Sequence, residues 1–221
     1  MPKETFNNLK EEKRAQFINA FLREFTLNSF DNASISKTLK SLKMAKGSFY
    51  QYFENKLDLF LYLHQSCAMT KGVYLQSIRR EDYDDFWDFW RAMYRSGLSF
   101  DREHPLRSNF MYSLMDTMNS PSLKEIYTEW RSKALEAMES MILQEVEKGK
   151  FRKDVSTKKM AFMLLTTSSQ LIDFLKLKMG TALDDNVMNG RPIFANCEED
   201  LMDTLEQFIS LMSSAMNEKT K

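Results

Sequence analysis

The scarcity of turn-forming residues is the feature that most restricts how this 221-residue chain can fold. The chain has only six glycines and four prolines, the residues that most often interrupt helices and form tight turns. Between them, apolar residues recur three or four positions apart, as in Phe17, Phe21 and Phe25, and this spacing predicts amphipathic helices. Apolar residues make up 43% of the chain, which is enough for a buried core. The sequence therefore predicts an all-α protein of about nine helices.

The apolar spacing and the helix start and stop signals together place the predicted helices. Ser34 is a suitable N-cap for the second of them, and Pro105 suits a first helical turn. The predicted helices span residues 10–27, 35–41, 45–52, 56 to the upper 70s, 82–100, 105–118, 121 to about 149, 157–178 and 198–216. Residues 180–197 contain two glycines and a proline, and they are predicted to form a long loop.

Charge is distributed unevenly although the total is balanced at 31 basic and 31 acidic residues. Residues 1–56 hold ten Lys or Arg and six Asp or Glu, which gives a net charge of +4, and the remainder carries −4. Residues 34–56 alone contain five lysines and one glutamate. A basic N-terminal part on an acidic remainder favours orientation of that part toward a polyanion such as DNA.

The two short helices predicted at 35–41 and 45–52 are joined by a tight connection at 42–44, which is the pattern of a helix-turn-helix. A recognition helix needs small or polar residues where it enters the major groove, and residues 45–48 are of this kind. The predicted DNA contacts share a polar or basic character, with glycine added for close backbone approach. They are Ser34, Lys37, Lys43, Lys46, Gly47, Ser48, Tyr50, Gln51, Tyr52 and Lys56.

The segment KGSFYQYFENKLDLF, residues 46–60, resembles the signature of the tetracycline-repressor (TetR) family. Gly47, Tyr50, Phe53, Lys56 and Leu59 stand where that pattern has them, and the resemblance covers about residues 10–60. It implies phosphate contacts for Tyr50 and Lys56, and more variable base-edge roles for Ser48 and Gln51. It also implies a DNA-binding domain over residues 1–55 and a ligand-binding and dimerisation domain over residues 56–221.

Two residues depart from the family pattern at places where glycine is usual. Lys43 occupies the turn position, and Ser29 stands near the end of the first predicted helix. If the backbone at Lys43 is left-handed, the side chain costs roughly 1 kcal/mol through steric crowding. These departures bear on individual contacts and leave the predicted domain unchanged.

The helix predicted at 82–100 is unusually aromatic. Apolar ligand pockets are lined in this way, and so are ordinary cores. The predicted ligand-binding residues are the aromatic ones of this helix and of the helix after Pro121, namely Phe86, Trp87, Trp90, Tyr94, Tyr127 and Trp130. Asp84, Asp85 and Asp88 flank the first four; they attract a cationic ligand or simply complement the dipole of the helix. A small apolar or aromatic ligand is expected.

The helices predicted at 157–178 and 198–216 are the expected dimer interface. Small residues midway along the first would let a partner helix come close, and the second carries an apolar seam. Two such helices from each chain would form a four-helix bundle; an intramolecular core is the alternative. The predicted interface residues are Met163, Thr167, Leu171, Leu201, Leu205, Phe208 and Met212.

Other classes of protein find little support in the sequence. Cys67 and Cys197 match no metal or disulfide spacing, and two free thiols fit the cytoplasm. No membrane-spanning run, signal-like N-terminus, phosphate loop or nucleophile motif is present. We therefore expect no metal, no cofactor and no catalytic residue. The prediction is a cytoplasmic dimeric repressor that binds a palindromic operator in double-stranded DNA and is released by a small ligand. The alternative is a helical small-molecule-binding or catalytic protein whose helix-turn-helix is only structural.

Overall fold

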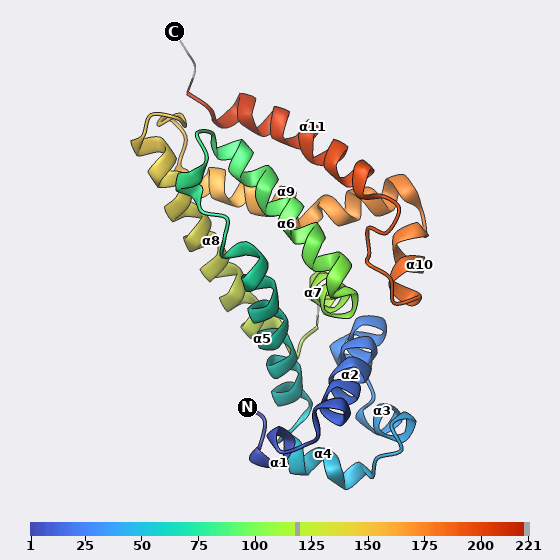
Figure 1. Cartoon of the computed structure of the whole chain (residues 1–221). Coiled ribbons are helices and arrows are strands. Elements are labelled where there is room, and N and C mark those ends of the chain that lie inside the picture. Colours follow the sequence, from blue (N-terminus) through green and yellow to red (C-terminus); the bar gives the residue numbers. More distant parts are fainter. Residues whose placement is uncertain (118–119, 219–221) are drawn as a thin grey trace.

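The computed structural model describes residues 1–117 and 120–218, and its described part is all helical (Figure 1). It contains eleven α-helices within those residues. They are α1 (Glu4–Asn7), α2 (Glu11–Asn32), α3 (Ile35–Ser41), α4 (Lys46–Tyr52), α5 (Lys56–Leu75), α6 (Phe86–Glu103), α7 (Pro105–Thr117), α8 (Lys124–Glu147), α9 (Thr157–Met179), α10 (Ala182–Met188) and α11 (Glu198–Met216). A short 3-10 turn, η1 (Arg80–Asp82), precedes α6. The all-α prediction is confirmed.

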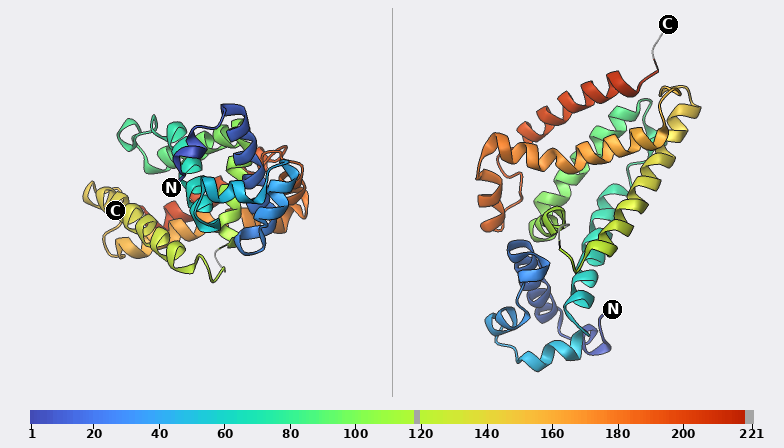
Figure 2. Two further views of the ribbon diagram at one scale, coloured as in Figure 1. Left: turned by 90° about the horizontal axis from the view of Figure 1, so that it is seen from below. Right: turned by 180° about the vertical axis from the view of Figure 1, so that it is seen from behind.

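The helices form an elongated molecule whose two ends differ in character. Figures 1 and 2 show α1 to α4 gathered at one end and α11 lying across the opposite end. The long helices α5 and α8 run between these ends. The short helices α3 and α4 therefore lie at one extremity of the chain.

Side-chain caps fix several of the helix starts. The Ser34 hydroxyl accepts a hydrogen bond from the Lys37 N–H at 3.3 Å, as its position before α3 predicted. Asn55 Oδ1 accepts from the Asp58 N–H at 2.9 Å at the start of α5. Asp85 Oδ1 accepts from the Trp87 N–H at 2.6 Å at the start of α6. Each cap provides an acceptor for a first-turn N–H that has no partner within its helix.

Several predicted boundaries differ from the structure. The helix expected from residue 82 begins at Phe86, because residues 80–82 form the 3-10 turn and Asp85 is the cap. The helix expected from Pro121 begins at Lys124, after a turn. The first helix continues to Asn32 through one non-helical residue. The expected end at residue 118 lies outside the described residues. The four-residue helix α1 had no prediction.

The loop prediction for residues 180–197 is wrong in part, because α10 lies within that segment. Gly180 and Gly190 flank the helix with φ values of 62° and 68°, and such left-handed glycines commonly end helices. Asn186, which is buried, donates to the Ile193 and Ala195 carbonyls at 3.1 and 2.9 Å. These hydrogen bonds hold the segment after α10 against the helix.

Apolar side chains pack in three clusters. The first runs from α1, α2, α3 and α4 into α5 and α7 and is dominated by phenylalanines. The second joins α6, α8, α9 and α11, and the third lies among α6, α9, α10 and α11. Because the first cluster crosses residue 55, the division into residues 1–55 and 56–221 stays a prediction. Among the described residues no helix is both long and apolar enough to cross a membrane.

Candidate DNA-binding surface and ligand pocket

The turn between α3 and α4 has the geometry of a helix-turn-helix. The Lys43 N–H donates to the Lys40 carbonyl at 3.1 Å, and the Met44 N–H donates to the Leu39 carbonyl at 2.9 Å. Lys43 has a φ of 55°, so its backbone is left-handed. The steric cost described in the sequence analysis therefore applies to this residue. The turn ends at Ala45, whose extended backbone starts α4. Two short helices are thus held at a fixed angle by a closed turn.

Most of the predicted DNA-contact residues lie on the outer face of this unit. Six are exposed, namely Lys37, Lys43, Lys46, Gly47, Tyr50 and Gln51, and three are half-buried, namely Ser34, Ser48 and Lys56. Tyr50 is 56% exposed, although its ring packs edge to face against Phe49 with the ring centres 5.4 Å apart. Figure 1 shows α3 and α4 at one extremity of the molecule. Their exposed polar and basic side chains therefore lie at that end.

Tyr52 is the exception and corrects the sequence prediction. Its side chain is 8% exposed, and its ring lies 5.7 Å from Phe6 and 5.8 Å from Phe17. Tyr52 is three residues after Phe49, so the helical repeat turns both side chains toward the core. The structure places Tyr52 in the core and not on the exposed face.

Lys56 has an additional structural contact that the sequence did not reveal. Its ammonium donates to the carbonyls of Asp31 and Ala33 at 3.1 and 3.3 Å, and it lies 4.8 Å from the centre of the Phe30 ring. A cation at the C-terminal end of a helix is favourable because the last carbonyls there lack partners. Since a lysine has three N–H donors, one remains for a phosphate.

The N-terminal segment holds the end of α4, and sequence reasoning missed it. The Lys3 N–H donates to the Tyr52 carbonyl at 2.9 Å, and Lys3 Nζ donates to the Tyr50 carbonyl at 2.8 Å. Thr5 Oγ1 donates to the Gln51 carbonyl. These are the terminal carbonyls of α4 that have no partner within the helix. No periodicity in the first residues indicated this contact.

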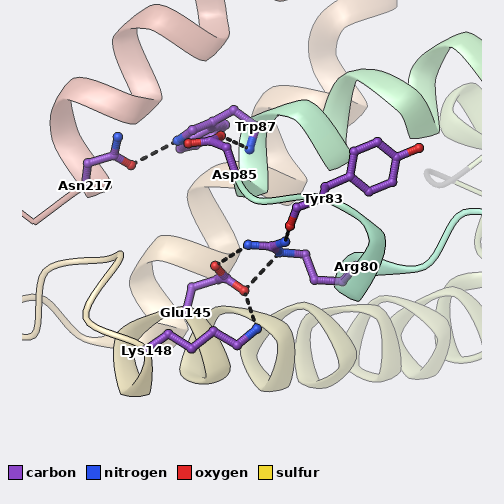
Figure 3. A network of polar contacts seen from close by, with 7 residues as sticks. All are labelled: Arg80, Tyr83, Asp85, Trp87, Glu145, Lys148 and Asn217. Atoms are coloured by element: carbon purple, nitrogen blue, oxygen red, sulfur yellow. Dashed lines mark hydrogen bonds and ion pairs between the residues drawn. The ribbon is translucent and has the colours of Figure 1, made fainter.

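The six aromatic residues predicted to bind a ligand do not come together. Phe86 and Trp87 pack against Phe151, with ring centres 5.1 and 5.7 Å from it. Trp87 Nε1 also donates to Asn217 Oδ1 at 2.9 Å (Figure 3).

The remaining four lie in three places. Trp90 and Tyr94 border one pocket. Trp130 stacks on His64 at 3.9 Å, and Tyr127 borders a surface groove between α8 and α9. Of the predicted residues, the pocket contains only the pair from α6.

The pocket bordered by Trp90 and Tyr94 has a volume of about 340 Å³ and lies among α5, α6, α7 and α9. Besides apolar side chains, it is lined by Lys71, Asp101 and Tyr112. Asp101 is 1% exposed and accepts hydrogen bonds from the hydroxyls of Tyr112, at 2.9 Å, and Ser108, at 2.5 Å. A pocket of this size with few polar groups suits a small, largely apolar molecule.

Burial controls the ionisation of the polar groups around the pocket. It raises the pKa of Asp101, although the hydroxyls of Ser108 and Tyr112 act in the opposite direction. It lowers the pKa of Lys71, and the nearby Asp101 charge opposes that change. The pKa of Tyr112 is raised by burial and by Asp101. Lys71, Asp101 and Tyr112 come from three helices, which is why no sequence motif joined them.

The predicted dimer residues are largely internal to the chain. Leu171, Leu201, Leu205 and Met212 are buried, and Met163, Thr167 and Phe208 are half-buried. The seam of α11 therefore packs on its own chain, and the prediction that the four buried residues face a partner is corrected. The exposed apolar side chains of α9 and α11 form a different set, namely Phe162, Phe174, Leu177 and Leu211.

A buried ion pair fixes the segment that follows α5 (Figure 3). Arg80 of η1 donates to both carboxylate oxygens of Glu145 on α8, at 2.7 and 3.0 Å, and also to the Tyr83 carbonyl. Lys148 donates to the same carboxylate at 3.2 Å. Glu145 is 0% exposed, so its charge depends on these partners. The contact ties the connection between α5 and α6 to α8.

The geometry and the comparisons with known proteins lead to the same class. An exposed basic face on two short helices joined by a closed turn defines a helix-turn-helix DNA-binding protein. Residues 17–63 match the sequence model of the bacterial regulatory proteins of the tetR family. Residues 17–63 therefore form the helix-turn-helix domain of the tetR family of bacterial regulatory proteins.

Solved structures share the fold over nearly the whole chain. A TetR family transcriptional regulator from Chloroflexus aurantiacus J-10-FL is 26% identical, covers 99% of this chain and 100% of its own, and has a TM-score of 0.81. The fatty acid degradation regulator FadR from Bacillus halodurans has a TM-score of 0.60 at 16% identity, covering 90% of this chain and 97% of its own.

The ketosteroid transcriptional regulator KstR2 of Mycobacterium tuberculosis has a TM-score of 0.58 at 10% identity, covering 96% of this chain and 98% of its own. The last two likenesses concern the fold alone. No curated protein matches the chain in sequence.

Proposed function

We propose that this protein is a dimeric transcriptional repressor that binds a palindromic operator and leaves it when a small molecule enters the pocket among α5, α6, α7 and α9. The observation that supports this most is the exposed basic face of α3 and α4 at one extremity of the molecule. In this proposal residues 1–55 form the DNA-binding domain and residues 56–221 form the ligand-binding and dimerisation domain. The protein acts in the cytoplasm and is not an enzyme.

The exposed residues divide into two roles on DNA. Lys37, Lys43 and Lys46 supply charge to the phosphates, and the Tyr50 hydroxyl holds a phosphate or sugar. The amide of Gln51 reads a base edge, since a glutamine can bond an adenine in two places. Gly47 lets the backbone of α4 approach the duplex, because no side chain stands there.

Dimerisation uses the outer faces of α9 and α11. Phe174 of α9 is 46% exposed, and its ring centre lies 5.6 Å from that of Phe208 of α11. The two helices α9 and α11 therefore share an apolar surface. Leu177 and Leu211 extend that surface. A twofold dimer presents two recognition helices to two half-sites, which are about 34–36 Å apart on B-DNA.

Release by ligand follows from the position of α5. This helix starts at Lys56, beside the end of α2, and reaches the pocket with Lys71 and Leu75. A ligand that prefers one position of α5 therefore also prefers one spacing of the two recognition helices. The ligand must bind the non-operator spacing more tightly, since equal affinity for both would shift nothing.

The experiment that tests this function is selection of bound duplexes from a random DNA pool by the purified protein. We expect an enriched inverted repeat, with affinity falling at a log–log slope of about −0.9 per phosphate neutralised as salt rises. Gln51→Ala should change the preferred sequence, and Lys133→Ala, which alters an exposed lysine of α8, serves as the control. Absence of enrichment at low salt from a folded, ligand-free dimer would reject the proposal.

A further inference from the structure

We infer that the pocket among α5, α6, α7 and α9 takes an apolar molecule that carries an acceptor oxygen, a carboxylate or a carbonyl, which receives hydrogen bonds from Lys71 and Trp90. This inference rests on the proposed function only in treating the pocket as the ligand site. It follows from the hydrogen-bonding groups that border the pocket, taken one at a time.

The walls of the pocket require an apolar body. Most of them are leucine, methionine, isoleucine and aromatic side chains from α5, α6 and α9, among them Leu75, Met93, Leu98, Leu165 and Ile172, and Phe194 adds a ring from the segment before α11. The volume of about 340 Å³ is that of a small ligand site. A molecule without apolar surface would leave these walls in contact with water.

The ammonium of Lys71 is the first of two hydrogen-bond donors that border the pocket. Among the described residues none accepts a hydrogen bond from its ammonium, which instead lies 5.9 and 5.8 Å from the ring centres of Phe100 and Tyr112. Ring faces attract a cation but provide no lone pair for its N–H groups. A half-buried ammonium in this state is poorly satisfied.

Trp90 is the second donor. Its side chain is 8% exposed, and its buried Nε1 has no hydrogen-bond partner among the described residues. An indole N–H is only a donor, so an acceptor alone can satisfy it. Lys71 comes from α5 and Trp90 from α6, and both border the same pocket.

The carboxylate of the pocket, in contrast, already accepts hydrogen bonds. Both oxygens of Asp101 accept hydrogen bonds, one from Ser108 and one from Tyr112. Among the described pocket-lining residues, Trp90 alone has a fully buried polar side-chain atom without a partner, and that atom is a donor. The ligand must therefore bring acceptors. A cationic ligand would face the Lys71 ammonium and an Asp101 already bonded twice.

The test compares ligands that share a carbon skeleton and differ in one group. Calorimetry with the full-length protein would use aryl and alkyl carboxylates, the matching methyl ketones, the matching primary amines and the parent hydrocarbons. We expect at least one skeleton whose carboxylate or ketone binds about tenfold tighter than its amine and its hydrocarbon, as a charge-assisted hydrogen bond implies. If the carboxylates bind more tightly than the ketones, the preferred ligand is an anion. If the two bind equally tightly, a neutral carbonyl is sufficient.

Two variants connect the preference to the two donors. Lys71→Met keeps an unbranched side chain that is one atom shorter and removes the charge. Trp90→Phe keeps an aromatic ring and removes the N–H. Each should weaken binding of the preferred ligand by about fivefold or more, while Lys133→Met on the exposed face of α8 leaves it unchanged. Circular dichroism establishes that each variant is folded, and either variant alone is enough for the test.

The outcomes separate this inference from the proposed function. Amines that bind as tightly as the acceptor ligands, affinities unchanged in both variants, or no binding by any skeleton would overturn the inference. Operator binding is measured separately without ligand, so a protein that binds DNA but none of these ligands still fits a DNA-binding regulator. A carboxylate that binds through Lys71 without releasing the operator would support the inference and reject ligand release.

Discussion

The core beneath the helix-turn-helix is filled with phenylalanine rings, whereas the core among α5, α6, α7 and α9 surrounds a pocket. In the first, Phe53 is fully buried and lies within 4.9 to 6.1 Å of the rings of Phe6, Phe17, Phe49 and Tyr62. In the second, the half-buried Lys71 has no hydrogen-bond acceptor among the described residues, and the buried Asp101 is held by two hydroxyls.

In the proposed function, the difference follows from where each part acts. The helix-turn-helix would act through side chains on its outer face, so its interior is free to pack tightly and hold α3 and α4 in place. The other part would act through groups that face inward, and those groups would have to stay accessible to a ligand. Tight packing gives stability, and an internal pocket gives up some of it for binding.

Truncating one phenylalanine in each core gives the largest expected effect. Phe53→Ala should lower the free energy of unfolding by about 3–5 kcal/mol, because it opens a cavity among packed rings. Phe194 is equally buried but borders the pocket, so Phe194→Ala should cost about 3 kcal/mol or less by the same relation. Urea unfolding at fixed protein concentration measures both, and equal costs would remove the contrast between the cores.

The second comparison is between a buried and an exposed ion pair outside the helix-turn-helix. Glu145 is fully buried with Arg80 and Lys148 around it (Figure 3), and Glu145→Gln should cost about 3–5 kcal/mol because the two cations lose the negative charge that balances them. Glu198 forms an exposed pair with Arg102. Glu198→Gln should therefore change stability by about 1 kcal/mol or less. A small effect at Glu145 in urea unfolding would mean that the anchor between η1 and α8 is weak.

The sequence was sufficient for the parts of the fold and site that depend on neighbouring residues. The bounds of α3 and α4 and the cap at Ser34 follow from local spacing and cap chemistry. The exposure of six of the predicted DNA contacts follows from the same helical repeat. Tyr52 was misplaced because an amphiphilic side chain at the boundary of a helix face suits either side.

The pocket could not be predicted in the same way, because its groups come from distant segments. Lys71, Asp101 and Tyr112 lie on three helices, and only tertiary packing brings them together. The apolar seam of α11 raised a related difficulty. Its spacing shows that one face is covered, but it does not distinguish the same chain from a partner, and Leu201 and Leu205 are covered by their own chain.

Lys71 should respond to substitution in the opposite direction from Glu145. Because its ammonium has no hydrogen-bond acceptor among the described residues, Lys71→Met should stabilise the ligand-free protein by about 1–3 kcal/mol, the usual cost of an unsatisfied buried group. Asp101 keeps both hydroxyl donors in the variant. Destabilisation by Lys71→Met would show that the lysine is instead needed to balance Asp101.

The same residue gives a pH dependence. Burial lowers the pKa of Lys71 in the folded protein below its ordinary 10.5. At pH values between the lowered pKa of the folded protein and 10.5, Lys71 is protonated in the unfolded chain but not in the folded one. The free energy of unfolding should therefore rise with pH over this range. The rise should be smaller in Lys71→Met. Urea unfolding of both proteins from pH 7 to 10 measures the difference, and parallel profiles would contradict the lowered pKa.

The backbone of the helix-turn-helix end offers the smallest effect and shows that its tight core tolerates strain. Ser29 interrupts α2 with φ 55° and ψ 174°, a region used almost only by glycine, and this bend brings Phe30 to a stacked position 6.1 Å from Phe25. Such a conformation costs about 1–3 kcal/mol for a residue with a side chain. Glycine avoids that cost but loses about 0.5–1 kcal/mol of chain entropy. We therefore expect Ser29→Gly to stabilise the protein by about 1 kcal/mol, with an upper limit of about 2.5 kcal/mol.

Lys43→Gly is the matched variant at the turn, where φ is also 55°. Its gain should be smaller, about 0.5–1 kcal/mol, since the left-handed region is less costly for a lysine. Lys43→Gly should also weaken DNA binding for all sequences and lower the salt slope by about one phosphate, whereas Ser29→Gly should leave the slope unchanged. Thermal unfolding and a salt titration of operator binding separate the two effects. Loss of stability in both variants would mean that the surrounding contacts, and not the backbone preference, fix these two joints.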